Sequence, residues 1–514
     1  MSRWHRALFV GVLILGALVY APHLPAPFVA DDHFIFWRLQ EGGAFGFATR
    51  PPTGFYRPLI SLHYYLDYLL WGIQPFWSHL VDVGWHLLCG GLVALFCLRW
   101  QLDRGCSHAQ AVRAALLAMA LFLVLPAHAE AVAWFAARAD MVATAAALAC
   151  LLLLHIGVRS GRPIYQWLAL LPFAGGLFAK ESLLSFPVIV WLWLRWLGVS
   201  RAGWHVLPYW MVLGAFWWLR SQAVGGLGAY PAAWETLHQP WWLVVHLAVY
   251  LMQLPMPTVL FGLGRDPLDT LLWLSWAIAL GLILLGLWGQ SPTLKSRREH
   301  LVLLSFALLA LLPVLVFKPS PWHFLNSRYS YFASVWLVVW VASLIVSGWE
   351  RLPLVRWGAI VLIAVYAIGT AHQANAWAVA GSIAQSTLQS LGDVPTDRSI
   401  VLISVPDHYR GAYIWRAGLD EARRLLLPER AHVPVYALSR FTMRLKPDAE
   451  VIYRAGEALL SHREDIFLLP EGLPLPPNSA GRWHVRPERV RIDPDWAQNY
   501  QLLRYQDGRF IPIH

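Results

Sequence analysis

Two adjacent carboxylates, Asp31 and Asp32, follow the first hydrophobic segment of the chain in the stretch FVADDHFIF. Acidic side chains at the mouth of a membrane helix are costly unless they serve binding or chemistry. One of them could act as a general base that takes the proton from an acceptor hydroxyl. The structural alternative is that both acids only cap a helix in the loop. In the company of the residues described next, we favour chemistry for the pair.

Basic side chains recur near the membrane face that these acids are predicted to share. Tyr56 and Arg57 begin the stretch YRPLISLHYYLDY, and the planar guanidinium of Arg57 could pair with a phosphate group. Lys180 stands beside an acid in AKES, and Arg328 and Tyr329 stand in NSRYSYF. Such cations could neutralise a lipid phosphate as negative charge develops on it. For Lys180 and Arg328 taken singly, snorkelling to the membrane interface is an equal alternative.

Further polar side chains interrupt the apolar stretches in two places. His79, Asp82 and His86 in SHLVDVGWHLL share one helical face, which is compatible with a metal site, a proton relay or a buried hydrogen-bonded network. Two histidines and one aspartate are a weak metal signal, so we favour the network. We predict no metal ligand set and no certain cofactor, although a divalent metal is compatible with the chemistry.

The stretch PAHAEAVAWFAARAD is predicted to form an outer turn between two membrane helices. His128 and Glu130 lie in the turn, and Arg138 and Asp140 follow inside the next helix. Residues 130–134 could line the site, whereas Arg138 and Asp140 could equally form a structural pair with each other.

Composition indicates the class of protein that must position these residues. Hydrophobic residues make up 58% of the chain, charged residues make up 14%, and the mean hydropathy is +0.48, which excludes a soluble globular protein. The formal charge of +10 resides mostly in short loops, without a basic run interleaved with aromatics, so no nucleic-acid partner is predicted. We therefore interpret the charge as a determinant of membrane topology.

About 20 apolar residues are needed to cross a bilayer. The sequence predicts eleven such spans, near residues 7–22, 78–99, 112–127, 134–157, 164–179, 183–198, 204–222, 270–289, 300–317, 329–348 and 355–372. The apolar segment 241–254 is interpreted as re-entrant or interfacial, because counting it as a span would move the basic cluster at 295–298 outside. Basic residues flanking the spans, Arg104 and Arg159 among them, then share the cytoplasmic side.

The predicted fold is an all-α polytopic membrane protein with a small C-terminal α/β domain. Residues 1–372 form the transmembrane catalytic domain, whose first external loop is about 23–77, and residues 373–514 form an extracytoplasmic domain. A strand is expected near 399–405 and a helix near 419–427. The preference for arginine over lysine favours a bacterial inner membrane.

Taken in order, these motifs resemble those of the GT-C glycosyltransferases. The likeness is greatest to the transmembrane and tetratricopeptide-repeat branch related to protein O-mannosyltransferases, through ADDHF, YRPL with LDYLLWG, the His79–His86 helix, PAHAEAVAW with ARAD, AKES and RYSYF. The resemblance implies an inverting transferase that moves a sugar from a polyprenyl-phosphate donor to an acceptor hydroxyl on the external face. It implies Asp31, or failing that Asp32, as the base, and Arg57, Lys180 and Arg328 as ligands of the donor phosphate.

The chain also departs from the pattern of this family. Leu125 stands where the family often has histidine, Asp82 where it often has asparagine, and Ser327 where it has an acid. The helical repeats are replaced by the tail, so the acceptor could be a glycan, a lipid or a protein. A transporter or flippase of a lipid-linked sugar, a glycan ligase and an inactive binding protein are the alternatives. A transporter should show repeated halves and midplane charges, whereas the acids here concentrate in one predicted external loop.

Overall fold

The chain divides into two compact units. The computed structural model describes residues 3–49, 54–225, 231–253, 267–288, 294–320, 324–349, 352–395, 398–444, 446–463, 465–470 and 474–513. The first unit, here the helical unit, comprises Met1–Ala21, Ala44–Leu66 and Ser78–Gln373. The second, here the tail unit, comprises Pro22–Gly43, Asp67–Trp77 and Ala374–His514. The predicted division into domains 1–372 and 373–514 stays a prediction.

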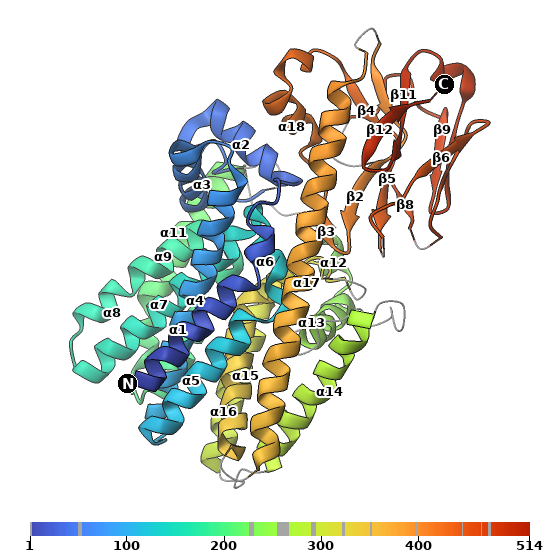
Figure 1. Ribbon diagram of the computed structural model, residues 1–514. Helices are drawn as coiled ribbons and strands as arrows, with labels where there is room; N and C mark the ends of the chain where they lie inside the picture. The colour runs from blue at the N-terminus through green and yellow to red at the C-terminus, as the bar shows by residue number, and fades with distance from the viewer. Residues whose placement is uncertain are drawn as a thin grey trace. The chain divides into compact units, whose positions relative to one another are not determined.

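Long apolar helices make up the helical unit, and Figure 1 shows α1, α4, α5 and α16 running alongside one another. Helix α5 packs on α1 and α16, α7 packs on α9, and α15 packs on α16. The helices that lie wholly or partly in this unit are α1 Arg3–Leu18, α3 Pro58–Trp71, α4 Pro75–Asp103, α5 His108–Leu123, α6 Ala129–Ala133, α7 Arg138–Ser160, α8 Ile164–Leu168, α9 Leu170–Ala179, α10 Phe186–Trp196, α11 Ala202–Val224, α12 Pro231–His238, α13 Trp241–Gln253, α14 Pro267–Trp288, α15 Leu294–Leu311, α16 Tyr331–Gly348 and α17 Pro353–Gly392.

The chain is an integral membrane protein. In the described ranges, five helices are long and apolar enough to cross a bilayer, within Arg3–His23, Pro75–Asp103, Phe135–Ser160, Ser327–Gly348 and Pro353–Gly392. A sixth span results if α5 and the segment Pro126–Ala133, which meet at a bend of 53°, count together. Each of the eleven predicted segments overlaps at least one helix, but the number of eleven spans is not confirmed. Helices α9 and α10 have only 10 and 11 residues, about 15 Å of rise, and a bilayer core is about 30 Å thick.

Helices α13 and α17 correspond to two of the apolar segments identified in the sequence. Helix α13 has 13 residues, too few for a straight span, and the end of the predicted segment at residue 254 lies outside the described residues. Helix α17 has 40 residues and continues to Gly392, well past the predicted end of the last span at 372. The polar part after residue 372 is rich in alanine and glutamine, which favour helix as strongly as the apolar part does.

One end of the helical unit is held by ion pairs between three separate segments. Asp103 at the end of α4 pairs with Arg159 of α7 at 2.7 Å, and its neighbour Arg104 pairs with Glu299 of α15 at 2.7 Å. These pairs confirm that Arg104 and Arg159 lie on one side, as the distribution of basic residues predicts. The compartment that this side faces stays a prediction.

The tail unit joins two short N-terminal segments to a region of small sheets. Helix α2 Asp31–Gly42 packs on α18 Leu419–Leu426. Three four-stranded sheets follow the orders β12-β11-β1-β4, β6-β7-β10-β9 and β3-β2-β5-β8, and Figure 1 labels most of their strands. The strand and helix expected near 399–405 and 419–427 are confirmed as β1 with the start of β2, and as α18.

The strands are β1 Ile400–Leu402, β2 Val405–Tyr409, β3 Ala412–Tyr413, β4 Val435–Ala437, β5 Arg440–Met443, β6 Val451–Arg454, β7 Glu457–Leu460, β8 Phe467–Leu468, β9 Trp483–Arg486, β10 Arg489–Ile492, β11 Gln501–Gln506 and β12 Arg509–Pro512. In the first sheet β1 runs parallel to both β11 and β4. A short helix, α19 Pro494–Ala497, precedes β11.

Candidate functional site

Two cations from distant parts of the sequence lie over one aromatic ring in the helical unit, and a third lies near them. Lys180, at the end of α9, places its Nζ atom 4.8 Å from the centroid of the Tyr329 ring. Arg328, in the short turn before α16, lies with its guanidinium carbon 4.4 Å from the same centroid. Arg57, just before α3, is close enough for its charge to act on both Lys180 and Tyr329. The structure thus brings together the three residues predicted to bind a phosphate.

Each of these cations is paired with a carboxylate. Arg57 donates from Nε and Nη2 to Glu181 at 2.9 and 2.7 Å, Lys180 pairs with Asp140, and Arg328 pairs with Glu130. Only 6% of the Lys180 side chain is exposed, so the snorkelling interpretation is wrong for this residue. Glu130 also accepts the backbone N–H of Arg328 at 3.0 Å, which fixes the turn that carries the guanidinium.

Arg138 and Asp140 do not pair with each other, so the structural pair that the sequence left open as an alternative is not formed. Arg138 donates instead to Asp82 of α4 and to the carbonyl of Ser78 at 3.0 Å, while Asp140 holds Lys180. Side chains two positions apart on a helix point to different sides, so α7 directs these two charges to different neighbours. The Arg138 guanidinium also lies over the ring of Phe135, 4.8 Å from its centroid.

A further arginine belongs to this site although sequence reasoning missed it. Arg220 of α11 lies 3.9 Å from Glu181 and donates to the carbonyl of Gly54 at 2.7 Å. A single charge within the apolar segment 204–222 was the signal that could have found it, because ionisable residues in membrane helices usually serve a site.

The cations around Tyr329, Arg220 and their partner carboxylates form what is here called the charged cluster, in which four cations face three carboxylates. The one positive charge in excess suits an anion with few charges. The members of the charged cluster are Arg57, Lys180, Arg220 and Arg328 with Glu130, Asp140 and Glu181.

Aromatic rings surround the charged cluster. The Arg328 guanidinium lies 4.9 Å from the Trp134 centroid, within the 130–134 segment that was expected to line the site. Tyr56 packs edge-on against Phe178 of α9, two positions before Lys180. Aromatic faces attract cations, so they help to hold the guanidinium and ammonium groups in place.

The buried histidines form a hydrogen-bonded network between helices. His86 contacts the carbonyl of Leu123 at 3.1 Å and the hydroxyl of Tyr331 at 2.8 Å. Because a carbonyl only accepts, Nε2 of His86 carries the proton and Nδ1 accepts from the tyrosine. Both ring nitrogens are thereby engaged, and the network interpretation is confirmed for His86.

His128 extends this network, and His79 is buried on the same helix as His86. His128 contacts the carbonyl of Phe122 at 2.9 Å and the hydroxyl of Ser334 at 2.8 Å. Asp82, which stands between the two histidines of α4, is committed to Arg138. These contacts connect α4, α5 and α16 below the charged cluster, so they serve helix packing.

The acid pair begins α2 in the tail unit. Ala30, with φ of 44°, occupies the N-cap position and makes no side-chain cap, so neither acid caps the helix in the expected way. Asp32 is 1% exposed and accepts the N–H of Val29 at 3.0 Å, whereas Asp31 is half-buried. Asp31 is therefore the more accessible of the two carboxylates.

Asp31 has acidic neighbours on α18. Burial raises the pKa of Glu421, and the charges of Asp420 and Asp31 raise it further. The backbone approaches very closely here, because a Cβ atom on Gly418 would lie 2.0 Å from the carbonyl oxygen of Ala30. The position and exposure of Asp31 thus depend on the absence of a side chain at residue 418.

A small cavity of about 190 Å³ lies within the tail unit, and its wall includes the residue that directly follows the acid pair. His33 lines it, and its Nδ1 atom has no hydrogen-bond partner among the described residues. Burial lowers the pKa of His33 to about 4, so the imidazole is neutral near pH 7. The cavity is otherwise mostly apolar, with Phe28, Trp415 and Leu388 among its walls.

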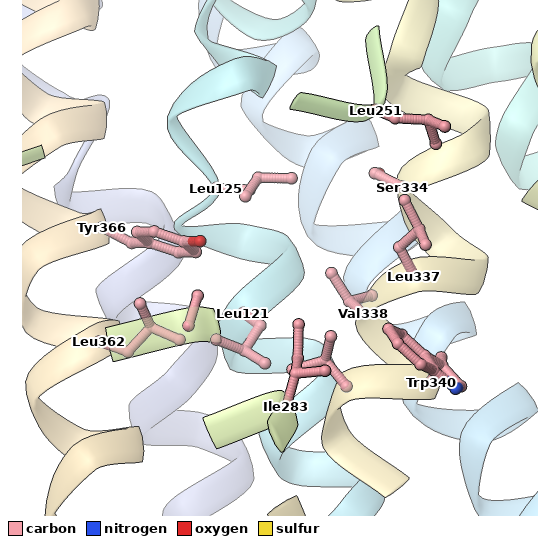
Figure 2. A pocket seen from close by; sticks show the side chains of 12 residues that line it. Leu121, Leu125, Leu251, Ile283, Ser334, Leu337, Val338, Trp340, Leu362 and Tyr366 are labelled. Carbon is pink, nitrogen blue, oxygen red and sulfur yellow. The ribbon is translucent and has the colours of Figure 1, made fainter. Parts of the chain in front are cut away.

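A second cavity of about 190 Å³ lies between α5, α13, α14, α16 and α17 in the helical unit (Figure 2). Figure 2 shows Leu125, Val338 and Tyr366 around it, with Ser334 as a polar side chain on its wall. Its lining is otherwise almost wholly hydrocarbon, which suits an apolar chain rather than a sugar.

Comparison with known proteins gives matches of limited extent. No protein-family model matches the chain. It is 33% identical over 136 residues to the Drosophila melanogaster protein O-mannosyl-transferase Tmtc1, and 31% identical over 246 residues to Tmtc2 of the same organism. The predicted resemblance to the O-mannosyltransferases is confirmed. The matches cover 26% and 43% of this chain, but only 14% and 25% of those relatives.

Solved structures give a weaker likeness. Crystal structures of ArnT from Cupriavidus metallidurans, bound to undecaprenyl phosphate or in the apo state, cover 88% and 84% of this chain at 14% and 13% identity. The chain covers 97% and 85% of those structures, and the TM-scores are 0.43 and 0.42.

Proposed function

We propose that this protein is an inverting membrane glycosyltransferase that moves a sugar from a polyprenyl-phosphate donor to an acceptor hydroxyl. The observation that carries the proposal is the convergence of Arg57, Lys180 and Arg328 around Tyr329. The sequence likeness to the O-mannosyltransferases supports the class of reaction. The reaction takes place on the external face of a bacterial inner membrane, with the tail unit outside. The acceptor is a glycan, a lipid or a protein.

The charged cluster binds the donor phosphate. Guanidinium groups pair with phosphate oxygens through two parallel hydrogen bonds, and their partner carboxylates hold them in a fixed arrangement beforehand. Such preorganised charges stabilise the phosphate most where negative charge grows as it leaves. Tyr56, Glu130, Arg138 and Tyr329 line and orient this cluster, while His79, Asp82, His86 and His128 fix the helices beneath it.

The apolar cavity in Figure 2 accommodates part of the polyprenyl chain. Membrane lipid surrounds the same helices, and many of their outward side chains, Leu284 and Trp357 among them, are exposed hydrophobics. An apolar chain can enter from the bilayer without crossing water, which keeps the cost of binding low.

Asp31 serves as the general base. It takes the proton from the acceptor hydroxyl, whose oxygen attacks the anomeric carbon from the face opposite the phosphate. The bond between that carbon and the phosphate oxygen breaks, and its electron pair stays on the phosphate. We assign this role to Asp31 because it is half-buried, while Asp32 is 1% exposed and bonded to Val29. The cations stabilise the negative charge that grows on the leaving phosphate.

The test is sugar transfer by the purified protein in lipid nanodiscs. Radiolabelled polyprenyl-phosphate monosaccharides are supplied one by one, with membrane extract as acceptor, and label is followed into covalently linked product. The proposal predicts transfer from at least one donor. A parallel assay in sealed vesicles follows movement of the intact donor between leaflets. Movement of intact donor without covalent transfer would overturn the proposal in favour of a transporter or flippase, and transfer of only whole oligosaccharides would favour a ligase.

A further inference from the structure

Basic side chains oppose one another across two strands of the tail unit. Strands β9 and β10 are antiparallel, with Arg486 directly opposite Arg489 and His484 directly opposite Arg491. Because alternate residues of a strand share a face, these four side chains lie on the same face of the sheet β6-β7-β10-β9. Arg486 and Arg489 thus place like charges in directly opposed positions, which destabilises the pairing of β9 with β10.

One carboxylate, Glu457 of β7, compensates part of this charge. Within the part of the chain that the structure describes, Arg489 pairs with Glu457 at 3.4 Å, and Glu457 also stands directly opposite Arg491 in the register of β7 and β10. Arg486 and Arg491 are in no ion pair there. Other arginines of the tail unit are paired more closely, such as Arg482 with Asp493 at 2.7 Å. The β9–β10 arginines therefore keep most of their hydrogen-bond donors available for a ligand.

The same residues line a cavity of about 550 Å³. Its walls are formed by Trp483, His484, Val485, Arg486, Arg489 and Arg491, with Leu469 from the edge of β8. This volume falls in the range of sites for small molecules and short saccharides. A guanidinium pairs with a carboxylate or a phosphate in two parallel hydrogen bonds.

We propose that this β9–β10 cavity binds an acidic glycan, a saccharide that carries carboxylate or phosphate groups. The opposed arginines recognise its charged groups. A bilayer surface is flat and reaches only the rim of a cavity, whereas a chain of sugar rings can enter it, so a glycan fits better than acidic lipid headgroups. We also assign this glycan as the acceptor of the transfer. That role rests on the proposed function, whereas binding of the glycan does not depend on it.

The experiment measures binding of the full-length protein, in phosphatidylcholine nanodiscs, to a polyuronate, a phosphorylated polysaccharide and neutral dextran. One variant combines Arg486→Gln, Arg489→Gln and Arg491→Gln. Its charge-matched control combines Arg424→Gln, Arg444→Gln and Arg509→Gln, three exposed arginines of the tail unit outside the cavity wall. We expect at least one acidic polysaccharide to bind both the wild type and the control variant, and dextran to bind neither. The cavity variant should bind that polysaccharide at least about tenfold more weakly than the wild type.

Equal loss of binding in the control variant would overturn the proposal, as would equal binding of dextran. A separate measurement uses vesicles that contain phosphatidylglycerol. If the cavity variant lost binding to these vesicles but not to the polysaccharides, lipid headgroups would be the partner and the proposal would be overturned. Thermal unfolding guards against a folding defect, because relief of the opposed charges should leave the melting temperature of the cavity variant unchanged or higher. Transfer from the polyprenyl-phosphate donor to a small neutral acceptor is independent of this site, so failure of the two proposals can be told apart.

Discussion

The ammonium group of Lys180 lies 4.8 Å from the centre of the Tyr329 ring while it pairs with Asp140 of α7. The chain places a buried lysine between an aromatic face and a carboxylate, at the point where Arg57 and Arg328 also gather. A buried cation in such a place has two roles. It completes an ion pair, which stabilises the fold, and it offers positive charge to a ligand.

Replacement of Lys180 separates these roles. Lys180→Met leaves Asp140 buried without its cation, and we expect a loss of about 3–5 kcal/mol in the free energy of unfolding. The double variant Lys180→Met with Asp140→Asn should recover most of that stability, because no uncompensated charge remains. It should still bind the polyprenyl-phosphate donor at least about tenfold more weakly, since the charge for the phosphate is gone. Denaturation in detergent and donor binding measure the two quantities, and wild-type binding by the double variant would show that Lys180 is only structural.

Gly418 is predicted to control the position of the loop that carries Asp31. Its φ is +83°, and a Cβ atom there would lie 2.0 Å from the carbonyl oxygen of Ala30. Gly418→Ala should therefore destabilise the tail unit by more than the roughly 1 kcal/mol that positive φ costs by itself, and should lower transfer. Gly481→Ala is the matched control, because Gly481 has φ of +74° with nothing within 4 Å of the added carbon. Equal effects of the two substitutions on stability and transfer would refute the close approach.

The tail unit should lose stability in strong acid through Asp407. Burial raises the pKa of this carboxyl, but the hydrogen bond and charge of His408, with the charge of Arg440, outweigh burial and lower it to about 2. The carboxylate thus stabilises the fold fully above its ordinary pKa of 3.8, and this contribution of about 2 kcal/mol disappears as the pH falls through 2.

Hydrogen exchange in the strands Val405–Tyr409 and Arg440–Met443 measures this effect in the whole chain. Wild-type protection should fall between pH 4 and pH 2. Asp407→Asn should be less protected near neutral pH and should show a smaller further loss over that interval. The same acid-dependent loss in both proteins would assign it to other carboxylates.

Sequence reasoning located the elements of the membrane region better than the partners of their side chains. Apolar runs identify helices because a segment in lipid must make its backbone hydrogen bonds within itself, as a helix does. Apolar side chains such as Leu121 and Val338 are compatible with any position along such a helix. The continuation of α17 to Gly392 was not foreseen, since hydropathy marks the end of a span and not the end of a helix.

The pairing of charges was the harder problem. Arg138 and Asp140 are neighbours in sequence, yet one contacts Asp82 and the other Lys180, because the helix surface turns them apart. Arg220 lies 163 positions after Arg57 and shares Glu181 with it, a relationship that only the packing of α11 reveals. In contrast, the convergence of Arg57, Lys180 and Arg328 was expected. Arg57 lies in the predicted first external loop, and Lys180 and Arg328 adjoin predicted spans at that same side of the membrane.

The central claim is that Asp31 is the base of a sugar transfer whose donor is held by other residues. The most direct test measures single-turnover transfer and equilibrium donor binding for Asp31→Asn, with Asp32→Asn as the matched neighbour. We predict that Asp31→Asn slows transfer by a factor of about 10²–10⁴, the usual contribution of a general base, and leaves the Kd of the donor within about twofold of wild type. Unchanged transfer by Asp31→Asn would contradict the account, and so would a loss of transfer that is fully explained by weaker donor binding.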